Sequence, residues 1–135
     1  MKTNILVHKH LIIRAESQKP IKNEDQAKEW LLGFIKSINM KVLIGPYAKY
    51  CNMEGNRGLT IIAVIETSHI VMHVWDEPIP ALMQIDIYSC GDFNEHDICK
   101  TLSKDFDLSK IEYKYLNRET GLTNISQGIL NYGVE

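Results

Sequence analysis

Three runs of alternating side chains follow one another in the middle of the chain with only short breaks between them. They cover residues 59–66, 69–75 and 81–89, which read LTIIAVIE, HIVMHVW and ALMQIDIYS. Apolar residues at every second position, many of them β-branched, are typical of strands. The breaks hold turn-forming residues, among them Pro78 and Pro80. This pattern predicts a largely antiparallel sheet.

The rest of the chain supplies further strands and two helices. Asn23, with Gln26 three positions later, is typical of a helix cap, and apolar residues then recur at helical spacing. The predicted elements are a strand at 9–16, a helix from 24 to about 39, a short strand at 41–45, a long turn-rich connection at 46–58, the three strands above, a helix at 94–106 and a strand at 110–117. Residues 119–135 show no clear period, and no structure is predicted for them.

The order of elements is β-α-β-β-β-β-α-β. It predicts an α+β fold, a two-layer α/β sandwich with a largely antiparallel sheet and two main helices on one face. The second face of the sheet also needs a cover, because its side chains are not uniformly polar. We expect a homodimer, in which a second copy supplies that cover.

Length and charge limit the class of protein. At 135 residues we expect one domain, 1–135, that folds without a disulfide or a metal. The formal net charge of −2 argues against nucleic acid or a membrane surface as a partner. The chain shows neither a long apolar run nor a signal peptide, so we expect a cytoplasmic protein whose three cysteines are free thiols.

Ser68 lies at the break between two predicted strands, directly after Thr67. A serine hydroxyl in a strained backbone can attack the preceding carbonyl, which turns the amide into an ester. Loss of the Ser68 Cα proton then releases the upstream chain, and hydrolysis of the remaining dehydroalanine leaves a pyruvoyl group. The alternative is that Ser68 is an ordinary turn residue.

Nearby residues could move protons. His69 and His73 share one face of a predicted strand, and a neutral imidazole can accept a proton near neutral pH. Cys90, before Gly91 at a strand end, could deliver one. The alternatives are histidines satisfied by backbone carbonyls and a small buried cysteine.

Other candidates are weaker. His8 and His10 share a strand face, but the acidic residues are not spaced to complete a zinc site, and we expect no metal. Cys51 and Cys99 are interpreted as structural. On the stiff corner before Pro78, Glu77 could accept hydrogen bonds from a diol, whereas Asp76 is more typical of a turn cap. Tyr47 and Tyr50 could stack on a planar base or seal the core.

Taken together, these residues resemble the single-domain prokaryotic-type S-adenosylmethionine decarboxylases, which carry a self-made pyruvoyl group. The likeness is strongest from residue 59 to residue 91, and the opening KHLIIRAE resembles the first strand of that family. The matching motifs, in order, are Ser68-His69, His73, Trp75-Asp76-Glu77 and Tyr88-Ser89-Cys90-Gly91.

The resemblance implies a set of roles in self-processing. Cleavage between Thr67 and Ser68 would make Ser68 the pyruvoyl group of a new chain, residues 68–135. His73 would assist the cleavage, and Thr60 occupies the position of a hydroxyl residue that helps it. The family usually has Glu immediately before the processed serine, where this chain has Thr67.

It also implies roles in decarboxylation. Cys90 would protonate the substrate after CO2 leaves, Glu77 would hold the ribose hydroxyls, and Tyr50 would stack on adenine. The substrate would be S-adenosylmethionine, decarboxylated to the aminopropyl donor for spermidine. Two alternatives stay open: a pyruvoyl decarboxylase of arginine or ornithine, and an unprocessed, non-catalytic homologue that serves as a binding or regulatory subunit.

Overall fold

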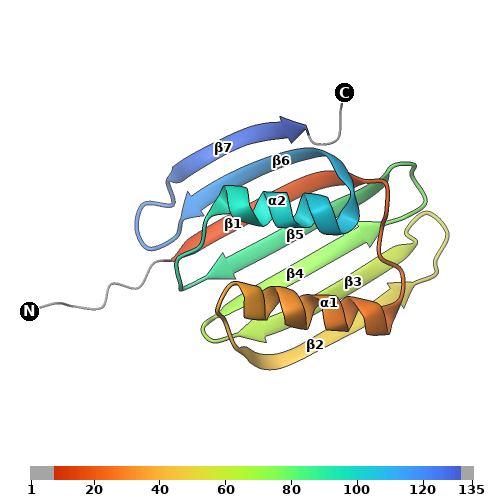
Figure 1. The fold of residues 1–135 in the computed structure, drawn as a ribbon, viewed down its shortest axis with the longest axis horizontal. Helices are drawn as coiled ribbons and strands as arrows, with labels where there is room; N and C mark the ends of the chain where they lie inside the picture. Colours follow the sequence, from red (N-terminus) through yellow and green to blue (C-terminus); the bar gives the residue numbers. More distant parts are fainter. Residues whose placement is uncertain (1–7, 132–135) are drawn as a thin grey trace, which may run out of the picture.

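A computed structural model describes residues 8–131, which form one antiparallel sheet with both helices on the same face (Figure 1). The elements are β1 (Lys9–Ser17), α1 (Glu24–Ser37), β2 (Val42–Cys51), β3 (Gly58–Ile65), β4 (Ser68–Trp75), β5 (Ala81–Ser89), α2 (Glu95–Phe106), β6 (Leu108–Asn117) and β7 (Asn124–Asn131). Their order across the sheet is β2-β3-β4-β5-β1-β6-β7, and every neighbouring pair is antiparallel. The predicted α+β sandwich is confirmed.

The hydrophobic core lies between the sheet and the two helices. Alternate residues of each central strand point toward the helices, as Ile70, Met72 and Val74 do on β4. Each such side chain contributes about 1.5–3 kcal/mol when fully buried. The helices supply the opposite half of the core with Ala27, Leu31, Phe34 and Ile35 from α1 and Ile98, Cys99, Leu102 and Phe106 from α2.

Side-chain caps set the start of both helices. Asn23 accepts a hydrogen bond from the backbone N–H of Gln26 at 2.9 Å, so α1 begins where the sequence predicted. Asn94 caps α2 in the same way through the N–H of Asp97. Neither helix of residues 8–131 is long and apolar enough to cross a membrane.

The prediction of a long connection at residues 46–58 was wrong. Strand β2 continues through Pro46 to Cys51, and the loop before β3 is only residues 52–57. Proline is tolerated here because β2 is an edge strand with one side free of partners, and the pairing with β3 is interrupted by bulges. The stretch without a predicted structure contains a second edge strand, β7.

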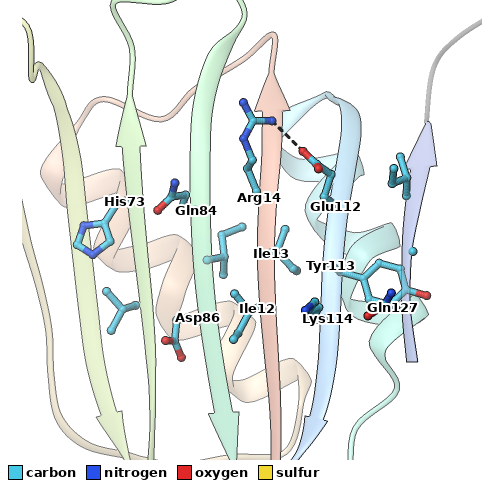
Figure 2. A pocket seen from close by; sticks show the side chains of 14 residues that line it. Ile12, Ile13, Arg14, His73, Gln84, Asp86, Glu112, Tyr113, Lys114 and Gln127 are labelled. Carbon is cyan, nitrogen blue, oxygen red and sulfur yellow. Dashed lines mark hydrogen bonds and ion pairs between the residues drawn. The ribbon is translucent and has the colours of Figure 1, made fainter. Parts of the chain in front are cut away.

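The sheet face away from the helices is open. It forms a hollow of about 1000 Å³ over β4, β5, β1, β6 and β7, with Arg14, His73, Gln84, Asp86, Glu112 and Lys114 among its lining residues (Figure 2). Exposed apolar side chains, including Ile12 and Ile129, share this face with the charges. A mixed surface of this kind, on a sheet covered on one side only, leaves room for a partner.

Gly58, the first residue of β3, is expected to be intolerant of any side chain. A Cβ atom there would lie 1.6 Å from the carbonyl oxygen of Val74. We expect Gly58→Ala to lower the free energy of unfolding by about 2–3 kcal/mol, because backbone must move to admit the methyl group. Chemical denaturation measures the change.

The matched control is Gly33, which lies inside α1; apart from its chain neighbours and the adjacent helix backbone, no atom lies within 4 Å of the position that an added methyl group would take. Gly33→Ala should raise the stability by about 0.5–1 kcal/mol through helix propensity alone. Equal effects of the two substitutions would contradict the close approach between β3 and β4.

Candidate active site at the turn between β3 and β4

The turn that joins β3 to β4 contains only Glu66 and Thr67, and Ile65 pairs directly with Ser68 across it. Such a tight hairpin needs residues with positive φ, a role that Asn and Gly usually fill. Here Thr67 takes a φ of 55°. A β-branched residue in this region costs about 1–3 kcal/mol, so the backbone immediately before Ser68 is strained.

Ser68 is the first residue of β4, and its side chain points to the buried face with 6% of the residue exposed. The hydroxyl donates to the carbonyl of Glu66 at 2.9 Å and accepts from the N–H of Cys90 at 3.3 Å. Rotation about the Cα–Cβ bond is therefore required to release the oxygen from Glu66 and turn it toward the Thr67 carbonyl.

Cys90 lies beside the turn because β5 runs antiparallel to β4 and ends where β4 begins. Its sulfur is 2.9 Å from Oγ1 of Thr67 and 3.4 Å from the carbonyl oxygen of Glu66. Cys90 is half-buried, whereas Cys99 is enclosed in the core, where burial raises the pKa of its thiol to about 12. The structure thus brings Thr67, Ser68 and Cys90 together, and we name these three residues the turn cluster.

His73 lies away from the turn cluster. It is five residues after Ser68, so the pleat of β4 directs it to the open face, roughly 16 Å along the strand. Its Nδ1 is 2.9 Å from Oγ1 of Thr60, its direct cross-strand neighbour. Figure 2 shows His73 on the open face, beside Gln84 of the next strand. Within one chain, neither His73 nor Thr60 can touch Ser68.

Glu77 lies at the same end of the β3–β4 hairpin as His73, and it holds the loop at residues 52–57. Its carboxylate accepts from the N–H of Gly55 at 3.2 Å, and from the N–H and guanidinium of Arg57 at 3.4 and 2.8 Å. The Gly55 N–H, together with the two Arg57 donors, holds the pKa of Glu77 below its usual value, although partial burial opposes this. Sequence reasoning missed Arg57 as the partner of Glu77.

Tyr50 is half-buried on β2, and its hydroxyl donates to Asp76 at 2.8 Å. That hydrogen bond, with desolvation and the negative charge of Asp76, raises the pKa of Tyr50. Tyr47 is largely exposed. We name Thr60, His73, Glu77 and Tyr50 the far cluster, because they all lie near the end of the β3–β4 hairpin opposite the turn. Within it Thr60 contacts His73 on the open face, whereas Tyr50 is paired with the buried Leu59 and packs against the core on the helix side.

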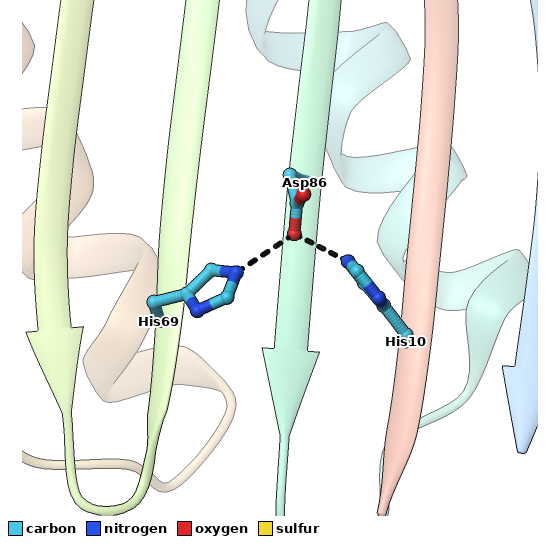
Figure 3. Close-up of side chains that lie close together, drawn as sticks. All are labelled: His10, His69 and Asp86. Carbon is cyan, nitrogen blue, oxygen red and sulfur yellow. Dashed lines mark hydrogen bonds and ion pairs between the residues drawn. The ribbon is translucent and has the colours of Figure 1, made fainter. Parts of the chain in front are cut away.

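A third group on the open face was not predicted. His10 and His69 both hydrogen-bond Oδ1 of Asp86, at 2.5 and 3.0 Å, from the strands on either side of it (Figure 3). Burial alone would raise the pKa of Asp86, but these two contacts outweigh it and the pKa is lowered. His8, which shares that face with His10, contacts the hydroxyl of Tyr88 instead.

Comparison with known proteins places the chain in a family. The family model described as S-adenosylmethionine decarboxylase matches residues 9–119, which is most of the chain. The chain belongs to the S-adenosylmethionine decarboxylase family. The resemblance seen in the sequence is therefore confirmed, and the matched region contains both the turn cluster and the far cluster.

Individual relatives agree with this placement. The S-adenosylmethionine decarboxylase proenzyme of Prochlorococcus marinus (strain MIT 9211) is 25% identical over 131 residues, covering 93% of this chain and 100% of the relative. The proenzyme of the same name from Pyrobaculum arsenaticum (strain DSM 13514) is 42% identical over 40 residues, which is 30% of each chain. That of Pyrobaculum islandicum (strain DSM 4184) is 40% identical over a segment of the same length.

Thr67 is where the chain departs from the usual sequence of the S-adenosylmethionine decarboxylase family, and the structure gives it two features that processing can use. Its φ of 55° strains the peptide before Ser68, and its hydroxyl contacts Cys90. Either feature could affect cleavage, and substitutions at this position separate them.

We expect Thr67→Gly to slow cleavage of the chain up to about tenfold, because glycine relieves strain worth about 1.4 kcal/mol. The control is Thr67→Val, which keeps the branched Cβ and removes the hydroxyl, and which should cleave at nearly the original rate. Gel electrophoresis of freshly synthesised protein over time gives both rates. Faster cleavage in the glycine variant would show that strain at Thr67 does not promote the reaction.

Proposed function

We propose that the chain is a precursor that cleaves itself between Thr67 and Ser68 and then decarboxylates S-adenosylmethionine with the resulting pyruvoyl group. The observation that carries the proposal is the turn cluster: a buried serine, preceded by a strained residue, with a thiol beside it. The family of the chain is the one in which this arrangement is expected.

Cleavage would begin when Oγ of Ser68 attacks the carbonyl carbon of Thr67, closing a five-membered ring. The C–N bond then breaks, leaving an ester to Oγ and a free Ser68 amine. Removal of the Ser68 Cα proton expels Thr67 as a carboxylate, and water converts the dehydroalanine to a ketone with release of ammonia. Relief of the strain at Thr67 favours the first step.

Decarboxylation needs an electron sink and a proton donor. The pyruvoyl group that Ser68 would provide would supply the electron sink that lets CO2 leave, as other carbonyl cofactors do. The backbone N–H of Cys90 contacts Oγ of Ser68, and its half-buried thiol contacts Thr67, which supports Cys90 as the residue that would return a proton to the substrate.

The contacts of Glu77 favour an adenosyl substrate over a basic amino acid. An ionised carboxylate has about four acceptor positions, and three are used by Gly55 and Arg57. A ribose hydroxyl can take the remaining position. The cation of arginine or ornithine would need an unpaired negative charge, and Arg57 already neutralises this one.

Intact-mass spectrometry of the purified protein tests the proposal. We expect fragments of residues 1–67 and 68–135, with the second starting in a pyruvoyl group, and a single uncut chain from Ser68→Ala. CO2 release should be faster from S-adenosylmethionine than from arginine or ornithine. A full-length chain that gives no fragment would defeat the proposal and favour a non-catalytic binding subunit.

We also propose that the protein works as a homodimer whose second copy covers the open face. The two clusters support this, because His73 and Thr60 can assist Ser68 only if they come from another chain. Pairs of opposite charge on the open face, such as Arg14 with Glu112, would let one copy face another without burying unpaired charge.

Co-expression of two uncleaved variants tests whether His73 of one copy assists Ser68 of the other. Ser68→Ala lacks the nucleophile and His73→Ala lacks the assisting imidazole, so neither should be cleaved alone. In a mixed dimer the His73→Ala chain keeps its own Ser68 and receives His73 from its partner, so we expect its cleavage to return. Absence of cleavage in the mixture, with mixed dimers demonstrated by differential tags, would show that His73 of one copy does not act on Ser68 of the other.

A further inference from the structure

The group formed by His10, His69 and Asp86 lies outside both clusters and brings two imidazoles and a carboxylate to one point on the open face (Figure 3). Strand register explains why they meet. His10 on β1 and His69 on β4 are both directly opposite Tyr88 on β5, and Asp86 is two residues before Tyr88 on the same face. Three adjacent strands in the middle of the sheet therefore hold the three side chains.

We propose that these three residues form a binding site for a divalent transition-metal ion, with Zn²⁺ as the probe. Their ligand atoms all lie within 4.8 Å of one another. Tetrahedral zinc with ligands at 2.0–2.2 Å needs them roughly 3.4 Å apart. The present hydrogen bonds of 2.5 and 3.0 Å would have to open by about 1 Å or less.

Within a single chain the side chains have room for that movement, and in the proposed homodimer the site would lie between the two copies. The side chains of His69 and Asp86 are 36% and 42% exposed, while that of His10 is 12% exposed and so gives the site a fixed side. Two imidazoles with one carboxylate suit zinc, cobalt or iron(II) rather than magnesium or calcium, which prefer oxygen ligands. Three protein ligands also leave at least one coordination position for water or another molecule.

Arg118 competes with a metal ion for His10, and metal binding would have to displace it. Its guanidinium donates to Nδ1 of His10 at 3.2 Å, which keeps the proton of the neutral imidazole on Nε2, the atom that faces Asp86. Coordination through Nε2 requires that proton to move to Nδ1 and Arg118 to withdraw. The guanidinium also lies over the ring of Tyr88, 4.2 Å from its centre, so it retains a contact when it leaves His10.

Substitution of Arg118 therefore distinguishes a metal-binding site from a group of residues that only hydrogen-bond one another. If the three residues serve only to hydrogen-bond one another, no Zn²⁺ binds here with or without Arg118. If they bind metal, Arg118→Ala removes both a competing donor and a positive charge, and the affinity for Zn²⁺ should rise about tenfold.

The test is titration of the chelator-treated full-length protein with Zn²⁺ by calorimetry, and with Co²⁺ by visible absorption. We expect one ion per chain, a loss of affinity of at least tenfold in His69→Ala and Asp86→Asn, and a gain in Arg118→Ala. His96→Ala is the matched control, because it removes an imidazole that contacts Tyr113 and has no part in the proposed cleavage, and it should bind Zn²⁺ as the unmodified protein does.

Absence of binding by the unmodified protein would overturn the proposal, and this outcome does not depend on how any variant folds. So would binding that survives in the His10→Ala, His69→Ala double variant, or that weakens in Arg118→Ala. None of these measurements requires cleavage at Ser68, so they test the metal site independently of the proposed decarboxylase activity.

Discussion

The alternating pleat of β4 determines how the chemistry of this protein is distributed. Ser68 occupies a position that points into the core, and every odd step from it, including His69 and His73, points to the open face. Antiparallel pairing with β3 and β5 then fixes which side chains meet, Thr60 with His73 and Cys90 with the turn. A slip of one residue in this strand would exchange the two faces and destroy the core and all three polar groups together.

Much of the fold could be predicted because its elements carry local signals. The Asn23 cap and the helical spacing of apolar residues located α1, that spacing alone located α2, and alternation located the central strands. The second half of β2 and the whole of β7 could not be found in this way. Strand β2 contains Pro46 and a bulged register, and β7 is largely exposed, so neither shows the one-sided burial from which alternation arises.

The site was predictable where its residues are neighbours along the chain or follow a motif, as Ser68 and Cys90 do. It was not predictable where strand register or a loop decides the contacts. Asp86 lies between His10 and His69 only because β5 pairs with both of their strands. The ion pair of Glu77 with Arg57 depends on the bend of residues 52–57, and no spacing in the sequence marks it.

The order of the strands has a consequence for the two pieces that the proposed cleavage would leave. Residues up to 67 contain β1, β2 and β3, and those from 68 contain β4 to β7, yet β1 lies between β5 and β6. The two pieces are therefore interleaved rather than laid side by side. To part, they would have to break the ladders β3–β4, β5–β1 and β1–β6 at once, and α1 would have to leave the shared core. Scission at the hairpin would thus alter the covalent connectivity of the molecule and preserve its fold.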